Sequence, residues 1–294
     1  MCVKIRISFY LGDDELYKIT LEMMDDFRQH LFNEERAEAT INKYLHDVEA
    51  FRKWLGQKEA AKQAVLEYKR KLVETHSPAS VNSMLSSLNM FFKFSEKTDL
   101  QVKLLKIQRN TFMDKEKELS KAEYEKLLRA AKNKNNERLY LLMQTICSTG
   151  IRVSELKFIT VEAIKIKEAR INCKGKHRRV LLPQKLCKIL SKYVKERKIQ
   201  SGSIFVTKSG KPLDRSNICH DMKKLCDDAG VLASKVFPHN LRHLFARTYY
   251  SIEKDIVRLA DILGHSGINT TRIYTMETGD VHRVQIQRLG LLIC

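Results

Sequence analysis

Apolar residues recur at helical spacing along the first hundred positions of the chain. One stripe lies behind Thr40, a candidate N-cap, and consists of Ile41, Tyr44, Leu45, Val48, Phe51 and Leu55. A second stripe follows Ser77 and Pro78, a pair typical of a helix start, and consists of Val81, Met84, Leu85, Leu88 and Phe91. Both stripes predict helices that bury one face in a core.

The opposite face of the second helix is polar and built from small side chains, namely Ser80, Asn82, Ser83, Ser86 and Ser87. Such a face suits either a nearby phosphate backbone or plain solvent. The sequence does not decide between these two interpretations.

The apolar periodicity stops over residues 101–117, an interval that ends in the charged run 114–117. An interval of this kind predicts a linker between two domains. We therefore expect a helical domain over residues 12–100 and a second domain over residues 118–294, which includes a C-terminal tail.

Helix signals open the second domain. Ser120 and Glu123 have the spacing of a capping box, and a further helix over about residues 136–148 should end at Gly150. Pro183 should begin another helix.

The pattern changes to that of strands over residues 170–182. β-prone residues at 171 and at 180–182 flank a Lys-Gly-Lys tip at 174–176, which predicts a β-hairpin. Helical periodicity dominates again from Asp214 onward.

Composition supports a folded protein that is not a membrane protein. The chain has 294 residues, of which 43% are hydrophobic, yet no stretch approaches the ~20 apolar residues of a membrane helix. The N-terminus lacks a signal-peptide pattern. Seven scattered cysteines without CxxC pairs favour reduced thiols. We expect a cytoplasmic protein.

The charge indicates a polyanionic partner, either nucleic acid or a membrane surface. The formal net charge is +19, and it is unevenly placed. Residues 1–50 carry six basic and eleven acidic residues, whereas residues 170–200 carry eleven basic and one acidic. The polyanion should therefore meet the second half of the chain.

Cleavage of a DNA strand without a metal needs three things. The attacking hydroxyl must lose a proton, the phosphorane charge must be neutralised, and the leaving 5′ oxygen must gain a proton. Arginine suits the second task because it stays charged and binds two phosphate oxygens at once. Two arginines supported by histidine and lysine would be sufficient.

The second domain offers these groups in four short segments: Thr149 to Leu156, Cys173 to Lys176, His239 to His243, and Leu263 to Ser266 followed by Tyr274. Together they resemble the Arg, Lys, His-x-x-Arg, His/Trp and Tyr boxes of the tyrosine recombinase family, which includes phage integrases and Xer-like enzymes. The resemblance spans about residues 118–280, and agreement of all four segments in this order is specific.

The resemblance implies a role for each polar residue. Arg152 and Arg242 would clamp the scissile phosphate, although Arg152 could also pair with Glu155. His239 would assist as acid or base, and His265 would donate a hydrogen bond to the phosphate. His243 is interpreted as facing away from this site and as structural.

The nucleophile implied by the resemblance is Tyr274, which would attack the phosphate and form a covalent phosphotyrosine. Lys174 would protonate the leaving oxygen from the hairpin tip, against the alternative of a solvated turn lysine. Family members usually carry Gly-Lys-Gly here, whereas this chain has Cys173 before the lysine and Lys176 two residues after it.

The same resemblance implies a mainly α fold with a small β-sheet. A helical core-binding (SAM-like) domain and a mixed α/β catalytic domain would form a C-shaped clamp on double-stranded DNA. The active form would be a homotetramer on two recombination sites, working through a Holliday junction. No metal or other cofactor is expected. Accessory DNA-bending or directionality proteins are further candidate partners.

Two other functions stay open. A type IB topoisomerase uses a similar set of residues without a partner site, and a non-catalytic DNA-binding relative would keep the fold alone. The first domain should begin within about a dozen residues of the N-terminus, without the arm-binding domain of larger phage integrases. The apolar tail consists of Val284, Ile286, Leu289, Leu291, Leu292 and Ile293. It should dock either on its own domain or on a neighbouring protomer.

Overall fold

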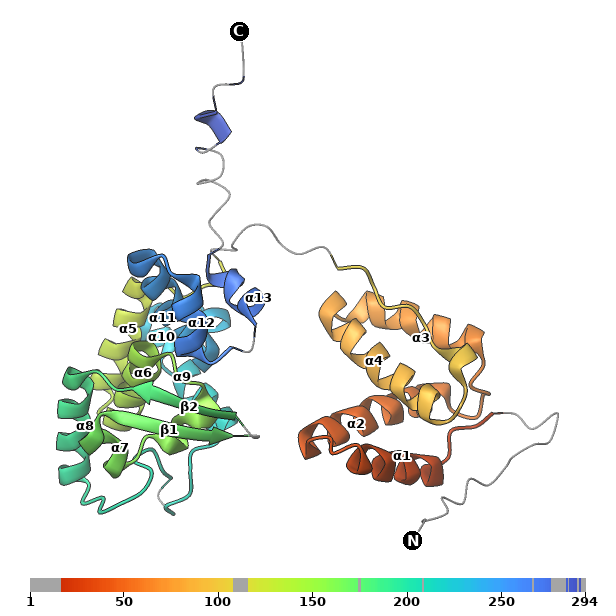
Figure 1. Cartoon of the computed structure of the whole chain (residues 1–294), viewed down its shortest axis with the longest axis horizontal. Coiled ribbons are helices and arrows are strands. Elements are labelled where there is room, and N and C mark those ends of the chain that lie inside the picture. The colour runs from red at the N-terminus through yellow and green to blue at the C-terminus, as the bar shows by residue number, and fades with distance from the viewer. Residues whose placement is uncertain are drawn as a thin grey trace. The chain divides into compact units, whose positions relative to one another are not determined.

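The structure is a computed structural model that describes residues 17–107, 116–173, 176–207, 209–265 and 267–275, together with residues 284, 286–289 and 291. Lys174 lies outside these described residues. The chain divides into two compact units, Met1–Arg109 and Asn110–Cys294, each described here by itself (Figure 1). The clamp arrangement expected from the resemblance therefore stays a prediction. In the described part, no helix has the length and apolar character needed to cross a membrane.

The first unit is helical, and its elements are α1 (Leu21–Asn33), α2 (Glu38–Leu55), α3 (Lys62–Thr75), α4 (Pro78–Phe94) and the 3-10 turn η1 (Thr98–Leu100). The apolar stripes predicted for α2 and α4 face one core around the fully buried Phe27, Phe51 and Phe91. The Ser77 side chain accepts from the backbone N–H of Ser80, as its position before a proline predicts.

The helix start predicted at Thr40 is wrong by three residues. The N-cap is Ala37, and the backbone N–H of Thr40 already donates to the Ala37 carbonyl at 2.7 Å. Thr40 therefore lies inside the first turn. Residues 38 and 39, Glu and Ala, are good helix formers that extend the helix backward.

The polar face of α4 is used largely inside the unit. The side chain of Asn89 pairs with the backbone N–H and carbonyl of Val102 at 2.9 and 2.8 Å, and Asn82 pairs in the same way with Leu105 at 2.7 and 2.9 Å. Each asparagine side chain thus bonds to both the N–H and the carbonyl of one residue, as the backbone of a neighbouring strand would. These bonds hold the segment from Gln101 to Leu105 along α4.

A buried hydrogen bond to a carboxylate ties α2 to α4. Ser87 is 0% exposed and donates to the buried carboxylate of Asp47 at 2.7 Å, which also accepts from Lys43. The polar face of α4 is therefore neither wholly solvated nor wholly free for phosphates, although Ser80 and Ser83 remain exposed.

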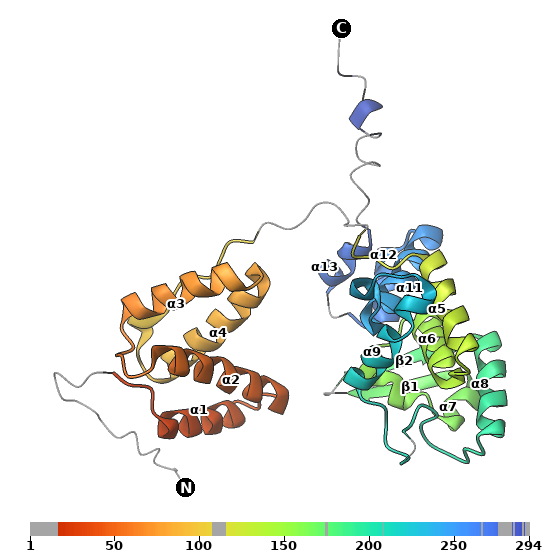
Figure 2. The same cartoon turned by 180° about the vertical axis from the view of Figure 1, so that it is seen from behind.

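The second unit is mixed, and its elements are α5 (Lys121–Asn133), α6 (Glu137–Thr149), η2 (Val153–Phe158), α7 (Val161–Ile166), β1 (Glu168–Cys173), β2 (Lys176–Leu181), α8 (Gln184–Glu196), α9 (Arg215–Lys223), α10 (Cys226–Ala229), η3 (Ala233–Lys235), α11 (Pro238–Glu253), α12 (Ile256–Leu263), α13 (Ile268–Thr271) and η4 (Arg272–Tyr274). The fold class predicted from the sequence, mainly α with a small sheet, is confirmed. The view from behind shows α5, α6 and α8 alongside the hairpin (Figure 2).

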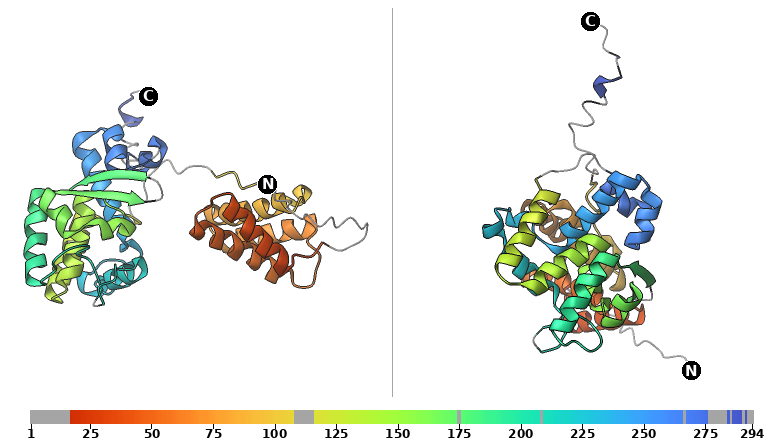
Figure 3. Two further views of the ribbon diagram at one scale, coloured as in Figure 1. Left: turned by 60° about the horizontal axis from the view of Figure 1, so that its bottom comes forward. Right: turned by 90° about the vertical axis from the view of Figure 1, so that its left-hand side faces the viewer.

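The predicted local signals of the second unit are also confirmed. Ser120 and Glu123 form both hydrogen bonds of a capping box, and α6 ends at Gly150 in the left-handed conformation. Strands β1 and β2 pair antiparallel as a hairpin (Figure 3), with Ile171 opposite Arg178. Ile171 is buried in the core of this unit.

Helix α11 is the central element of the second unit. It packs against α6, α12 and η4, and it carries His239, Arg242 and His243. Its residue Leu241 belongs to the main core, whereas Ala246 packs in a smaller cluster with Tyr274. The tail lies beyond these elements, and its described apolar residues Val284, Ile286, Leu289 and Leu291 are 45–82% exposed. The choice between docking in cis and in trans stays open.

Replacement of Asn89 by Ala should destabilise the first unit by about 1–3 kcal/mol, because a backbone N–H and a carbonyl at Val102 lose their partners. Trp54 is the only tryptophan of the chain and lies in the first unit. Its fluorescence during urea unfolding of the full chain would report this loss. The exposed Asn42 on α2 is the control, and an equal effect of Asn42→Ala would contradict the interpretation.

Candidate functional site

The C-terminal end of α12 gathers three arginines from distant parts of the chain. The carbonyl of Ile262 accepts from Arg178 at 2.6 Å. The next carbonyl, of Leu263, accepts from Arg242 at 2.7 Å. The third, of Gly264, accepts from Arg152 at 3.1 Å. The last carbonyls of a helix lack partners inside the helix and carry its negative dipole end, so they are suited to cations. We call Arg152, Arg178 and Arg242 the arginine cluster.

A buried carboxylate balances part of this charge. Glu155 is 5% exposed and accepts from the Arg152 guanidinium at 3.1 Å, from the Arg152 backbone N–H at 2.9 Å, and from Arg178. Burial alone would raise the pKa of Glu155, but the hydrogen bonds and charges of the two arginines outweigh it and lower the pKa. Glu155 is therefore ionised and joins Arg152 to Arg178. The pairing of Arg152 with Glu155, which the sequence left as an alternative, is present.

Gly264 fits this site because it has no side chain. Its φ is +62°, and an added Cβ would lie 2.5 Å from Cδ of Arg178. A side chain here would push Arg178 away from Glu155 and from the Ile262 carbonyl. The sequence thus uses glycine both to end α12 and to let Arg178 approach.

Arg242 is the most deeply buried member of the cluster, at 1% exposed. It donates to the carbonyl of Gly150 as well as to that of Leu263, and its Nε has no hydrogen-bond partner within the described parts of the chain. Burial, and next the charge of Arg152, lower its pKa to about 10. Arg242 stays charged at neutral pH and ties the end of α6 to the end of α12.

His265 is fixed as a neutral ring by its two partners. Its Nε2 lies 3.0 Å from Nη2 of Arg242, which can only donate, so Nε2 accepts. Its Nδ1 lies 2.9 Å from Oγ1 of Thr271 and is left to carry the hydrogen. Desolvation, followed by the charges of Arg242 and Arg152, lowers the pKa of His265 to about 4.

His239 lies at the start of α11 with its side chain partly in solvent. Desolvation by the surrounding protein, and then the nearby His243 and Arg242, lower its pKa to about 4. Its ring contacts the ring of His243, with centroids 4.4 Å apart. His239 is therefore neutral at pH 7 and faces the same side of α11 as His243.

Tyr274 lies between two imidazole rings and is 5% exposed. Its ring centroid is 6.3 Å from that of His265, nearly parallel, and 5.1 Å from that of His243, edge to face. Burial raises the pKa of Tyr274, while the positive charge of Arg242 acts in the opposite direction. The hydroxyl is thus neutral and withdrawn from solvent.

The structure brings together Arg152, Arg242, His239, His265 and Tyr274 from the residues proposed by sequence. It also brings in Arg178 and His243, which the sequence interpretation left out. His243 does not face away from the site: it is four residues after His239 and therefore on the same face of α11. That spacing could have revealed it. Arg178 gave no comparable signal, because its role depends on strand register.

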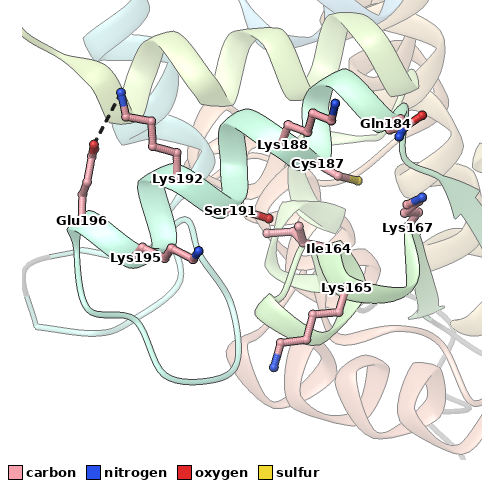
Figure 4. A pocket seen from close by; sticks show the side chains of 10 residues that line it. All are labelled: Ile164, Lys165, Lys167, Gln184, Cys187, Lys188, Ser191, Lys192, Lys195 and Glu196. Carbon is pink, nitrogen blue, oxygen red and sulfur yellow. Dashed lines mark ion pairs between the residues drawn. The ribbon is translucent and has the colours of Figure 1, made fainter.

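A basic groove of about 690 Å³ lies elsewhere on the unit, between α7 and α8 (Figure 4). Its lining includes Lys165, Lys167, Lys188, Lys192 and Lys195, with Glu196 as the acidic member. None of the residues of the arginine cluster lines it. The basic excess of residues 170–200 is therefore divided between this groove and the hairpin.

Family comparison supports the sequence resemblance. The model described as Phage integrase family matches residues 117–279, and the model described as Phage integrase, N-terminal SAM-like domain matches residues 24–98.

Individual proteins show likeness over most or part of the chain. Tyrosine recombinase XerA of Pyrococcus furiosus is 28% identical over 281 residues, which cover 92% of this chain and 95% of XerA. Tyrosine recombinase XerH of Campylobacter jejuni is 37% identical over 181 residues, which cover 58% of this chain and 51% of XerH. A crystal structure of a lambda integrase tetramer bound to a Holliday junction has a TM-score of 0.71 at 17% identity, covering 87% of this chain and 77% of that chain. The last likeness shows the fold alone.

The His265 ring should titrate near pH 4 in the folded chain, well below the usual value of about 6.5. Between these values the unfolded chain binds a proton that the folded chain does not, so His265 lowers stability as pH falls through this window. NMR of the imidazole protons, with His265→Asn to assign the signal, would measure the midpoint. A midpoint close to 6.5 would contradict the neutral tautomer.

Proposed function

We infer that this chain, which belongs to the phage integrase family, is a site-specific tyrosine recombinase that breaks and rejoins DNA. The observation that carries this inference is the convergence of Arg152, Arg242, His265 and Tyr274 at one end of α12. Such a set can neutralise a phosphate and supply a hydroxyl nucleophile.

We propose that Tyr274 attacks the scissile phosphate and becomes a 3′-phosphotyrosine while the 5′ oxygen leaves. The broken bond is exchanged for another phosphodiester, so religation needs no ATP. Arg152 and Arg242 would bind the non-bridging oxygens as the negative charge develops. His239 would assist as acid or base, and Lys174 would protonate the leaving oxygen.

Cleavage requires the site to rearrange when DNA binds. Arg242 is 1% exposed and Tyr274 is 5% exposed, so both groups offer little surface to a phosphate as they stand. A phosphate oxygen would take over hydrogen bonds that Arg242 now gives to carbonyls and to His265. We propose that a phosphate displaces the carbonyls from Arg242 while Tyr274 keeps its contact with His243. His265 would then be free to donate to the phosphate.

The partner we propose is a double-stranded DNA recombination site, acted on by a homotetramer that holds two sites. The solved lambda integrase complex, with its tetramer on a Holliday junction, supports this by likeness of fold. The relatives named XerA and XerH support an Xer-like enzyme. We further propose that the two units grip the duplex as a clamp, that the enzyme acts in the cytoplasm, and that accessory DNA-bending proteins direct the outcome.

Recombination is tested directly with a plasmid that carries two copies of the site mapped on DNA flanking the gene. The expected result is a pair of resolved circles or an inverted segment. Relaxation of supercoils without recombinants would favour the topoisomerase function instead. The absence of any covalent adduct would favour a non-catalytic DNA-binding protein.

Tyr274→Phe should abolish the covalent adduct on a nicked suicide substrate and leave DNA binding nearly unchanged. The change removes one hydroxyl and retains the basic surface. Gel analysis of protein bound to labelled DNA after denaturation would measure the adduct. Persistence of the adduct would place the nucleophile on another residue.

Arg152→Ala and Arg242→Ala should each slow cleavage by about 10²- to 10³-fold or more, because both cations act on one developing charge. Their effects should not add in the double variant. Lysine should rescue poorly, since it cannot bind two oxygens in a fork. Lys188→Ala in the groove of Figure 4 is the control and should cleave normally. Near-normal cleavage by either arginine variant would remove that residue from the site.

A further inference from the structure

His243 is held beside the candidate nucleophile by a carboxylate from the start of the second unit. Its Nδ1 lies 3.3 Å from Oε1 of Glu118, and Glu118 also accepts from Arg247. Arg247 in turn donates to the carbonyl of Leu119 at 2.7 Å, which fixes the segment that carries Glu118. Glu118 therefore fixes the orientation of the His243 ring, and the same ring also contacts Tyr274.

The charge of Glu118 determines which nitrogen of His243 carries the hydrogen. Burial alone would raise the pKa of Glu118, but the hydrogen bond from His243 and the charge of Arg247 outweigh it and lower the pKa. An ionised carboxylate can only accept, so Nδ1 of His243 carries the hydrogen. In the neutral ring, Nε2 is then an acceptor.

That acceptor is buried and has no hydrogen-bond partner in the part of the chain that the structure describes. An unpaired buried polar atom costs about 1–3 kcal/mol. Because this unpaired nitrogen lies beside the candidate nucleophile, we expect it to gain a hydrogen-bond partner during the reaction. Two neighbouring groups carry a proton, the ring of His239, with its centroid 4.4 Å from that of His243, and the hydroxyl of Tyr274, whose ring centroid is 5.1 Å away. Of these, the hydroxyl is the group that must lose its proton in cleavage.

We propose that Nε2 of His243 receives the proton of Tyr274 during cleavage, with Glu118 as the positioning residue. The order of carboxylate, imidazole and hydroxyl is that of an activated nucleophile. His265 is less suited, because its Nδ1 pairs with Thr271 and the proposed function assigns its ring to the phosphate. The inference rests on the proposed function and deepens it.

The step balances as a proton transfer coupled to phosphoryl exchange. The bond from Oη of Tyr274 to phosphorus forms, and the bond from phosphorus to the 5′ oxygen breaks. The Oη proton moves to Nε2 of His243, and the carboxylate of Glu118 balances the imidazolium that results. The leaving oxygen takes its proton from a separate acid, for which Lys174 is proposed. Religation returns the proton from His243 to Tyr274.

The test compares two nicked suicide duplexes that carry the mapped site, one with a normal 5′ bridging oxygen and one with sulfur. A sulfur leaving group needs no proton, so it relieves the loss of an acid but not the loss of a base at the nucleophile. His243→Phe keeps an aromatic ring beside Tyr274 and removes Nε2. We expect it to slow adduct formation by about 10²- to 10⁴-fold on both duplexes, with unchanged DNA binding.

Further variants separate a chemical role from a packing role. Glu118→Gln should slow the reaction in the same direction, and adding it to His243→Phe should slow it no more. Lys174→Ala should be slow on oxygen and recover on sulfur. If His243→Phe does not fold, His243→Gln carries the same test, with unfolding followed in parallel.

Two results would overturn the inference. One is a normal rate for the folded His243 variants, and the other is recovery of those variants on the sulfur duplex, which would assign His243 to the leaving group. Failure of the proposed function is distinct, because the unsubstituted chain would then form no adduct on either duplex.

Discussion

The C-terminal end of α12 is the contact on which the candidate site depends. Its three last carbonyls each bind a different arginine, from the residue before η2, from β2 and from α11. Without these carbonyls, three guanidinium groups would repel one another in a partly dry environment. The negative end of a helix offers a concentrated set of acceptors that cannot move independently. The arginine cluster is therefore held together by backbone geometry.

Carboxylates complete this arrangement at two separate points. Glu155 binds Arg152 and Arg178, whereas Glu118 binds Arg247 and His243. A buried ion pair adds little net stability, because removing both charges from water costs much of what their attraction returns. Its value here is orientation. Glu155 holds Arg152 and Arg178 side by side, and Glu118 accepts from Nδ1 of His243 and so leaves Nε2 without a hydrogen.

Much of this site could be predicted from sequence, because its residues lie in short segments with fixed local geometry. The spacing of His239 and Arg242 and the glycine after α6 specify positions within a helix or at its end. Arg178 could not be found this way, since its partner Glu155 is 23 residues away and depends on hairpin register. Glu118 is 125 residues from His243, and only the packing of α11 brings them together. The start of α2 was predicted at Thr40, a residue type common at N-caps, but Glu38 and Ala39 favour helix and extend it toward the N-terminus.

The two histidines that flank Tyr274 have opposite hydrogen-bonding states, and this difference follows from their neighbours. His265 faces Arg242, a donor, and its Nε2 is already occupied. His243 faces Glu118, an acceptor, and its Nε2 is unoccupied among the described residues. If a phosphate takes the Arg242 hydrogen bonds, Nε2 of His265 loses its donor, and the ring can then turn toward the phosphate or gain a proton. His243 keeps its partner throughout, because Glu118 does not contact the arginine cluster in the described contacts. Under the proposed function, phosphate binding would therefore change the state of His265 and leave His243 fixed. Two otherwise similar rings beside Tyr274 can thus serve different tasks, one as a hydrogen-bond donor to the phosphate and the other as the base.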